Sequence, residues 1–174
     1  MAQFVGPNIR YTGKGIHHTY TSESIDYGVW TYLEGSGSFI TKVPVTCDIL
    51  IVAGGGSGGT HKGGGGGAGG MIVSSSVSIA AGTYTTVVGA GGAARQVDGY
   101  STSHPNFGLN SQFGTRLAIG GGGGGSGNSA AGSGGSGGGA NGGYATTGPV
   151  GVNAKIGSGS AGPQGNNGGH SHVT

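Results

Sequence analysis

Glycine makes up 48 of the 174 residues of this chain, and it is concentrated in blocks that alternate with short β-like segments. The two densest blocks span residues 54–70 and 120–143. Glycine loses more backbone entropy on ordering than any other residue, and it has no side chain to bury. Such blocks are therefore either flexible linkers or polyglycine segments whose backbones pack directly against one another.

The remaining composition limits the function classes. Hydrophobic residues amount to 33%, which predicts a small core. A formal net charge of +2 without a basic cluster gives no reason to expect binding to nucleic acid or to an anionic membrane. The first residues lack the basic segment of a signal peptide and no apolar run could span a bilayer, so we expect synthesis in a cytoplasm and no membrane insertion. The single cysteine, Cys47, excludes an internal disulfide and indicates a buried small side chain rather than a reactive thiol.

The segments between the glycine blocks have the alternating or continuous apolar patterns of β-strands. We expect strands at residues 25–33, 38–43, 46–53, 71–79, 84–88 and 116–119, a turn at 34–37 and a hairpin turn at 80–83. No segment has a convincing helical period. The sequence therefore predicts an all-β protein, built of short β-strands and a hairpin with a glycine-rich bundle and no α-helix.

Three parts are expected along the chain. Residues 1–24 show no sustained period and are interpreted as an N-terminal attachment arm. Residues 25–119 form a β-rich region that includes the first glycine block and the hairpin. Residues 120–174 form a glycine-rich region and tail.

The spacing of glycine in the tail indicates how the blocks pack. Gly159, Gly162, Gly165 and Gly168 follow one another at intervals of three. A polyproline-II helix of glycine has three residues per turn, and its outward amides can bond neighbouring helices laterally. We therefore expect a polyglycine-II helix bundle rather than a random linker. The repeat is too short for an independent collagen triple helix.

The order of strands and glycine blocks resembles the glycine-rich domain of bacteriophage tail-fibre and adhesin proteins. The resemblance covers residues 27–145 and is carried by Asp48–Gly59, by GGAGGMIV at 66–73 and by AGTYTTVVGAGG at 81–92; NSQFG at 110–114 and the glycines after Ala118 continue it. It implies bundled polyglycine-II helices in a virion protein that often touches the host surface. We further expect a homotrimer, assembled in the host cytoplasm, that binds other virion proteins through residues 1–24 and a host glycan or outer-membrane protein as receptor.

Enzyme motifs lack their structural context. Gly54, Gly56 and Gly59 match G-x-G-x-x-G after a strand, but no helix can begin there and no acidic residue lies about 20 positions further on. Lys62 is followed by Gly63 instead of Ser or Thr, so a phosphate-binding Walker loop is excluded as well. The five acidic residues are dispersed, and nothing resembles a nucleophile elbow. We expect a non-enzymatic protein without a cofactor.

The histidines allow one metal hypothesis. His170 and His172 would lie on the same face of an extended strand, and three copies around an axis would offer six nitrogens to an octahedral transition metal. A polar, frayed C-terminus is the simpler interpretation. His17 and His18 are neighbours that would point to opposite faces of a strand, so joint chelation is not expected.

Receptor recognition should reside in loops, because a bundle without side chains has no specificity of its own. The segment 95–109 mixes aromatic, hydroxyl, amide and charged groups, although an ordinary surface loop explains it equally well. The candidate receptor contacts are Arg95, Asp98, Tyr100, His104, Asn106 and Phe107, with His61, Lys62 and Tyr144 as minor candidates. The sequence thus favours a phage structural protein of the tail-fibre or adhesin type over a purely architectural capsid or tail decoration protein without receptor binding. A secreted glycine-rich or ice-binding protein fits less well.

Overall fold

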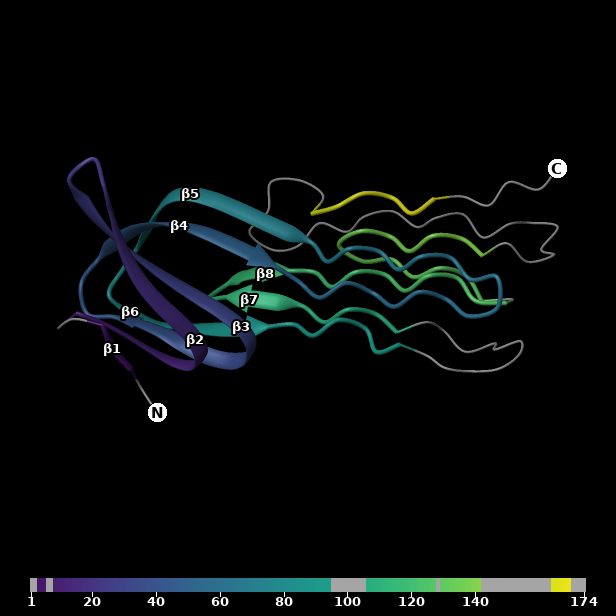
Figure 1. The fold of residues 1–174 in the computed structure, drawn as a ribbon, viewed down its shortest axis with the longest axis horizontal. Coiled ribbons are helices and arrows are strands. Elements are labelled where there is room, and N and C mark those ends of the chain that lie inside the picture. The colour runs from purple at the N-terminus through teal and green to yellow at the C-terminus, as the bar shows by residue number, and fades with distance from the viewer. Residues whose placement is uncertain (1–2, 6–7, 95–105, 128, 142–163, 170–174) are drawn as a thin grey trace.

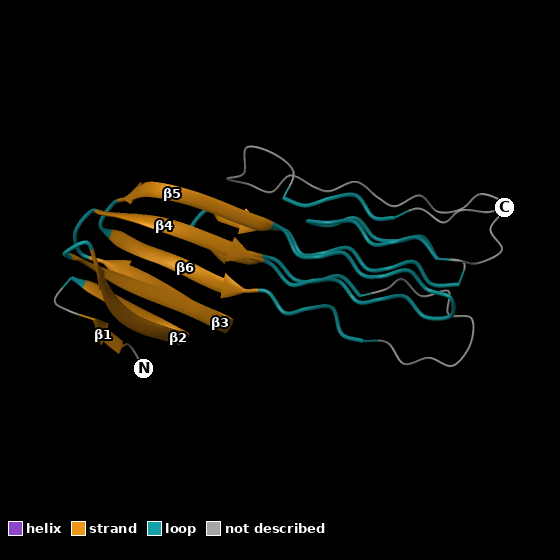
Figure 2. Cartoon of the chain, turned by 45° about the horizontal axis from the view of Figure 1, so that its top comes forward, coloured by secondary structure: helices purple, strands orange, loops and turns teal. Residues whose placement is uncertain are grey.

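The computed structural model describes residues 3–5, 8–94, 106–127, 129–141 and 164–169, and these form two regions placed end to end (Figure 1). All the strands lie in one region, and extended glycine-rich segments run side by side away from them in the other (Figure 2). The described residues contain no α-helix, so none of them could cross a membrane as a helix. The expected all-β fold without helices is thus confirmed for this part of the chain.

The strand region consists of two antiparallel sheets. Its strands are β1 (Gln3–Val5), β2 (Ile9–Ser22), β3 (Ile25–Thr41), β4 (Val45–Val52), β5 (Met71–Ile79), β6 (Gly82–Val88), β7 (Ser111–Phe113) and β8 (Arg116–Ala118). One sheet has six strands in the order β1-β2-β3-β6-β7-β8, and β4 pairs with β5 in a second, two-stranded sheet. Pro44, which cannot donate to a strand ladder, lies in the connection from β3 to β4, where the chain changes sheets.

The N-terminal residues are part of the sheet, although residues 1–24 show no sustained period in the sequence. β2 pairs with β3 from Ile9↔Thr41 to Ser22↔Ile25 and forms a long ribbon. The expected turn at residues 34–37 is also wrong, because β3 continues through it. The pairing shifts register between Thr12 and Gly15, where Gly13 and Gly35 have φ of +91° and +71°. A bulge of this kind bends a ribbon without ending it.

The hairpin expected across residues 80–83 is a crossover between the two sheets. β5 pairs with β4, whereas β6 pairs with β3 and β7. The period-two pattern of each strand was recognisable, but the pattern does not say which neighbour a strand bonds to. β6 reaches β3 because Gly35–Thr41 continues beyond the bulge and offers a free edge of matching length.

A small core lies between the two sheets, next to the start of the glycine segments. It consists of Ile49, Ile51, Ala53, Ile72 and Ala118, with Cys47, Val77 and Phe113 packed against it. The inward residues of β4 and β5 alternate with exposed ones, as the pleat requires.

The second region consists of the glycine-rich segments that connect or follow strands of the two sheets. We call it the glycine bundle and define it as the described residues 53–70, 89–94, 106–110, 119–127, 129–141 and 164–169. The bundle therefore takes segments from both sides of the boundary expected at residues 119 and 120. The three-part division of the chain stays a prediction. In the described residues, segments of the strand region and segments of the glycine bundle alternate along the sequence.

Candidate functional site

The glycine bundle is the scaffold on which any binding residues at its far end are carried. Its central segment, residues 120–127, is buried throughout. A Cβ atom added at Gly121, Gly124 or Gly59 would lie within 3.0 Å of backbone atoms of the neighbouring segment. Because real side chains never approach backbone this closely, only glycine permits this packing.

Hydrogen bonds between the segments recur every third residue. The amides of Ala53, Gly56 and Gly59 donate to the carbonyl groups of Gly70, Gly67 and Gly64 at 3.0, 2.8 and 2.8 Å. Along the central segment, Gly121 and Gly124 donate to Gly54 and Ser57, whereas Gly122 and Gly125 donate to Ser136 and Gly139. Successive amides therefore bond different neighbours, which ties the segments together laterally and makes the bundle a rigid support.

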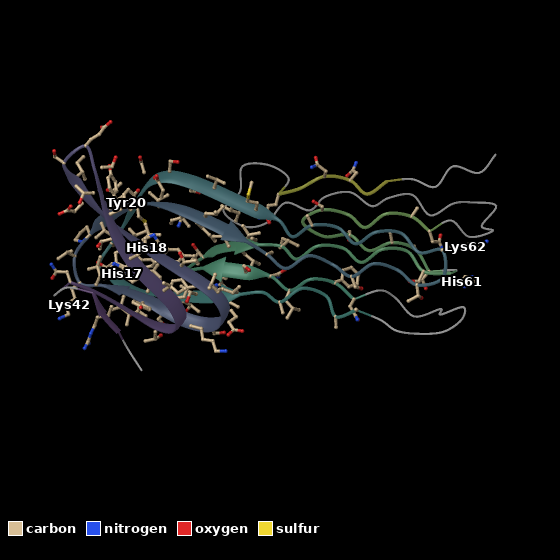
Figure 3. All side chains as sticks on the ribbon, viewed as in Figure 1. His17, His18, Tyr20, Lys42, His61 and Lys62 are labelled. Atoms are coloured by element: carbon tan, nitrogen blue, oxygen red, sulfur yellow. The ribbon has the colours of Figure 1, made fainter. Side chains whose placement is uncertain are left out.

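The turn at the end of the first glycine hairpin carries two exposed basic or titratable side chains, His61 and Lys62. They lie at the end of the molecule farthest from the strands (Figure 3). Their φ angles are +48° and +55°, in the left-handed region that favours glycine. The Thr60 amide donates to the Ser126 hydroxyl at 3.0 Å and so fixes the turn to the central segment. Two exposed larger side chains therefore occupy turn positions that glycine would adopt with less strain.

Of the segment 95–109, the structure describes residues 106–109, which belong to the glycine bundle. Asn106 bonds Ser57 through its backbone, and its side-chain Nδ2 donates to the carbonyl of Ala93 at 2.7 Å. Asn106 thus links the described residues that lie on the two sides of residues 95–105. Phe107 is half exposed and packs beside Gly132. Of the candidate contacts, the structure therefore places Asn106 at the base of the loop and Phe107 on the side of the bundle.

The other candidates, Arg95, Asp98, Tyr100, His104, Tyr144, His170 and His172, lie outside the described residues. Their proposed roles stay predictions. In the described part of the chain, no three His, Cys, Asp or Glu side chains are close enough to hold a metal ion.

Aromatic side chains at the opposite end of the molecule were not singled out from the sequence. On the β2–β3 ribbon, His17 lies against Trp30 with ring centroids 4.8 Å apart, and Tyr20 stacks on Tyr27 at 5.0 Å. His17 and His18 occupy opposite faces of β2, as the strand period predicts (Figure 3). The signal that could have found these pairs is the register of the hairpin, which requires the turn at Glu23 and Ser24 to be recognised first.

Cys47 has the character of a structural thiol. It is half-buried beside the core. Burial raises the pKa of the Cys47 thiol, Arg116 opposes this shift and Asp48 adds to it. A raised pKa keeps the thiol protonated and a poor nucleophile, which agrees with the interpretation drawn from its sequence context.

A family model described as a glycine-rich domain matches residues 34–174, which is most of the chain. The match begins within β3 and includes the whole of the glycine bundle. No curated protein and no solved structure shows significant similarity to the chain.

Proposed function

The chain belongs to the glycine-rich domain family, and on that premise we propose that it is a non-enzymatic structural protein of a bacteriophage virion, of the tail-fibre or adhesin type. In this role it presents host-recognition loops on a polyglycine scaffold. The proposal draws on the resemblance of its strand and glycine order to tail-fibre domains. It includes assembly as a homotrimer in the host cytoplasm and a host glycan or outer-membrane protein as receptor.

The scaffold in this proposal is a bundle of polyglycine-II helices. The supporting observation is the three-residue repeat of the bonds from Ala53, Gly56 and Gly59 to a single neighbouring segment. A polyproline-II helix repeats every three residues, so each helix can bond several neighbours at once. Such a bundle keeps its shape through backbone hydrogen bonds and needs few large side chains. This suits a rod that holds its far end away from the particle.

The observation that carries the recognition role is the turn at His61 and Lys62. Holding an L-residue in the left-handed region costs roughly 1–2 kcal/mol, and this turn has two such residues in succession. Strain of this kind tends to be kept where the side chains serve a function. The ammonium and imidazole groups can donate hydrogen bonds to sugar hydroxyls or to carboxylates of a receptor.

Attachment to the particle would use the other end of the molecule. Residues 9–22 form one strand of the β2–β3 ribbon, whose tip projects from the strand region away from the bundle (Figure 1). Binding of other virion proteins through residues 1–24 would therefore leave the His61–Lys62 turn pointing outward.

The test is a pair of substitutions that relieve the backbone strain of the turn and remove its two side chains. The double variant His61→Gly, Lys62→Gly relieves the left-handed strain, so we expect a thermal midpoint at least equal to that of the original chain. Virions assembled with this variant should adsorb to host cells at least tenfold more slowly. Lys42→Gly, which removes an exposed lysine at the opposite end, is the matched control and should adsorb normally.

The loop is tested in the same assay by replacing residues 95–105 with a short glycine–serine linker. Asn106–Leu109 is left intact, because the carbonyls of Asn106 and Leu109 accept bonds from Ser57 and Gly54. Normal adsorption by both the double variant and the loop replacement would reject the recognition role. It would favour the second candidate, a purely architectural capsid or tail decoration protein, which the exposed apolar residues of the β4–β5 sheet described below also suit.

A further inference from the structure

One long face of the molecule combines exposed apolar side chains with glycines and runs from the β4–β5 sheet into the bundle, and the exposed Asp48 of β4 lies at its border. On the outer side of the β4–β5 sheet, Leu50 pairs with Val73 and Val52 pairs with Met71. These side chains are 65%, 65%, 52% and 54% exposed, respectively. The same two segments continue into the bundle, where the outward positions recur every third residue. We call the outer face the set Leu50, Val52, Gly55, Gly58, Gly65, Ala68, Met71 and Val73.

The glycines of this face are not explained by the fold of a single chain. Among the described residues, a Cβ atom added at Gly65 would meet nothing within 4 Å, and one at Gly58 would come no closer than 3.7 Å to its nearest neighbour. Neither residue has a positive φ. Inner glycines such as Gly121 are required by backbone contacts, whereas the described residues leave room for a side chain at Gly58 and Gly65. Close approach of a second backbone would give them the same reason to be glycine.

Four amides of this face donate no hydrogen bond to the described glycine segments, whereas the Met71 amide donates to the Gln164 carbonyl. The four are the amides of Gly55, Gly58, Gly65 and Ala68. They recur at the three-residue spacing by which the inner segments bond one another. A backbone with the same spacing is therefore the partner that fits them.

We propose that the outer face packs against the outer face of another copy of this chain, with the bundles parallel around a common axis. In this arrangement the apolar pairs of the strand region meet each other, and the bare glycine segments meet each other. This inference names the surface through which the homotrimer of the proposed function would assemble. It rests on the proposed function only for the expectation that the chain self-associates. None of the eight residues of the face is charged, and Asp48 is the charged residue of β4 at its border.

The size of the face is consistent with a small specific interface. The exposed side chains and the adjoining glycines present on the order of 500 Å² per copy, so facing copies would bury about 1,000 Å², close to the lower limit for specific association. An apolar patch of several hundred square ångströms is also larger than monomers usually expose without a function.

The molar mass of the full chain in solution tests the proposal. Sedimentation equilibrium at about 1–100 µM covers the range in which a small interface associates. We expect a mass two or three times the 16.5 kDa of one chain. Leu50→Asp and Gly65→Val should each weaken association at least tenfold, and the open space around Gly65 allows that variant to keep its fold.

Gly82→Val is the matched control for Gly65→Val. Gly82 lies at the start of β6, and a Cβ atom there would also have ordinary space, with its nearest contact at 3.8 Å. This variant should associate like the original chain, and circular dichroism should show the same fold for all variants. A mass of one chain at every concentration would overturn the proposal. So would association that survives both outer-face variants, or that Gly82→Val weakens to the same extent. The mass does not depend on adsorption to cells, so failure of the recognition role would leave this result standing.

Discussion

The strand region packs through its side chains, whereas the glycine bundle packs through its backbone. In the strand region, side chains such as Ile51 and Ile72 fill the space between two sheets. In the bundle, segments pack because side chains are absent, and the backbone supplies both the contact surface and the hydrogen bonds. The first region repeats every two residues and the second every three. Where β4 and β5 continue into the bundle, the bond from the Ala53 amide to the Gly70 carbonyl keeps the two segments paired.

This difference predicts mirrored responses to mutation. Removing a methyl group should damage the strand region, because it leaves a cavity in a small core. Adding a methyl group should damage the bundle, because the neighbouring backbone occupies the space. If removing and adding methyl groups had the same effect in both regions, the claim that they pack by different means would be wrong.

The largest effect is expected for Ile51→Ala in the strand region. Ile51 is buried in the core cluster, and a substitution of this kind costs about 2–5 kcal/mol of unfolding free energy. Urea denaturation followed by circular dichroism measures the loss. Leu33→Ala, at an exposed position on β3, should change the free energy by less than about 0.5 kcal/mol.

Gly124→Ala should have the next largest effect, of about 3 kcal/mol, because its new methyl group would overlap backbone atoms of Gly64 and Gly65. Gly91→Ala is the matched control in the same bundle. A Cβ atom there meets its nearest neighbour at 3.6 Å, so the control should unfold like the original chain. Equal stability of the two variants in urea would mean that close backbone packing does not hold the bundle together.

Gln164 tests the junction of the two regions. Its side chain accepts from the Ile119 amide at 2.7 Å and donates to the Leu117 carbonyl at 2.9 Å, while its own carbonyl accepts from Met71. Gln164→Ala removes the side-chain partner of two part-buried backbone groups and should cost about 2 kcal/mol in the same denaturation assay. Asn166→Ala, at an exposed position two residues later, should be neutral; a similar loss there would show that the whole segment, rather than the Gln164 side chain, is responsible.

The smallest effect concerns pH and is confined to the strand region. Burial raises the pKa of Tyr32 to about 12, with a contribution from Tyr11. The folded state therefore favours the neutral phenol, and its stabilisation is complete below pH 10 and lost as the pH rises from 10 to 12. The unfolding free energy of the original chain should fall more over this interval than that of Tyr32→Phe. Since Tyr32 is half-buried, the difference will be small, and parallel pH curves for the two chains would contradict it.

Much of the local structure could be predicted from the sequence. The apolar run before Gly54 and the alternation in residues 71–79 correspond to β4 and β5. The pairing of strands could not be predicted, because β5 and β6 follow each other in the sequence but bond in different sheets. The continuous β3 was missed because Gly35 and Gly37 have the composition of a turn, whereas their position opposite Gly13 makes them part of a bulge.

The candidate site could be predicted only in part. His61 and Lys62 stood out as an interruption of a glycine block, and their place at the end of the bundle follows from the hairpin around them. Their left-handed conformation could not be predicted, because the dipeptide His-Lys is not typical of such turns. The scaffold role of Asn106 depends on its distance from Ala93 in space, which the sequence does not contain.

Amide hydrogen exchange of the central segment tests the main claim most directly. If backbone packing holds the bundle together, the amides of Gly121, Gly122, Gly124 and Gly125 should exchange as slowly as those of β4, with protection lost only on global unfolding. Exchange of these glycine amides at the rate of an unstructured chain, while β4 remains protected, would show that the glycine blocks are linkers and would contradict the account.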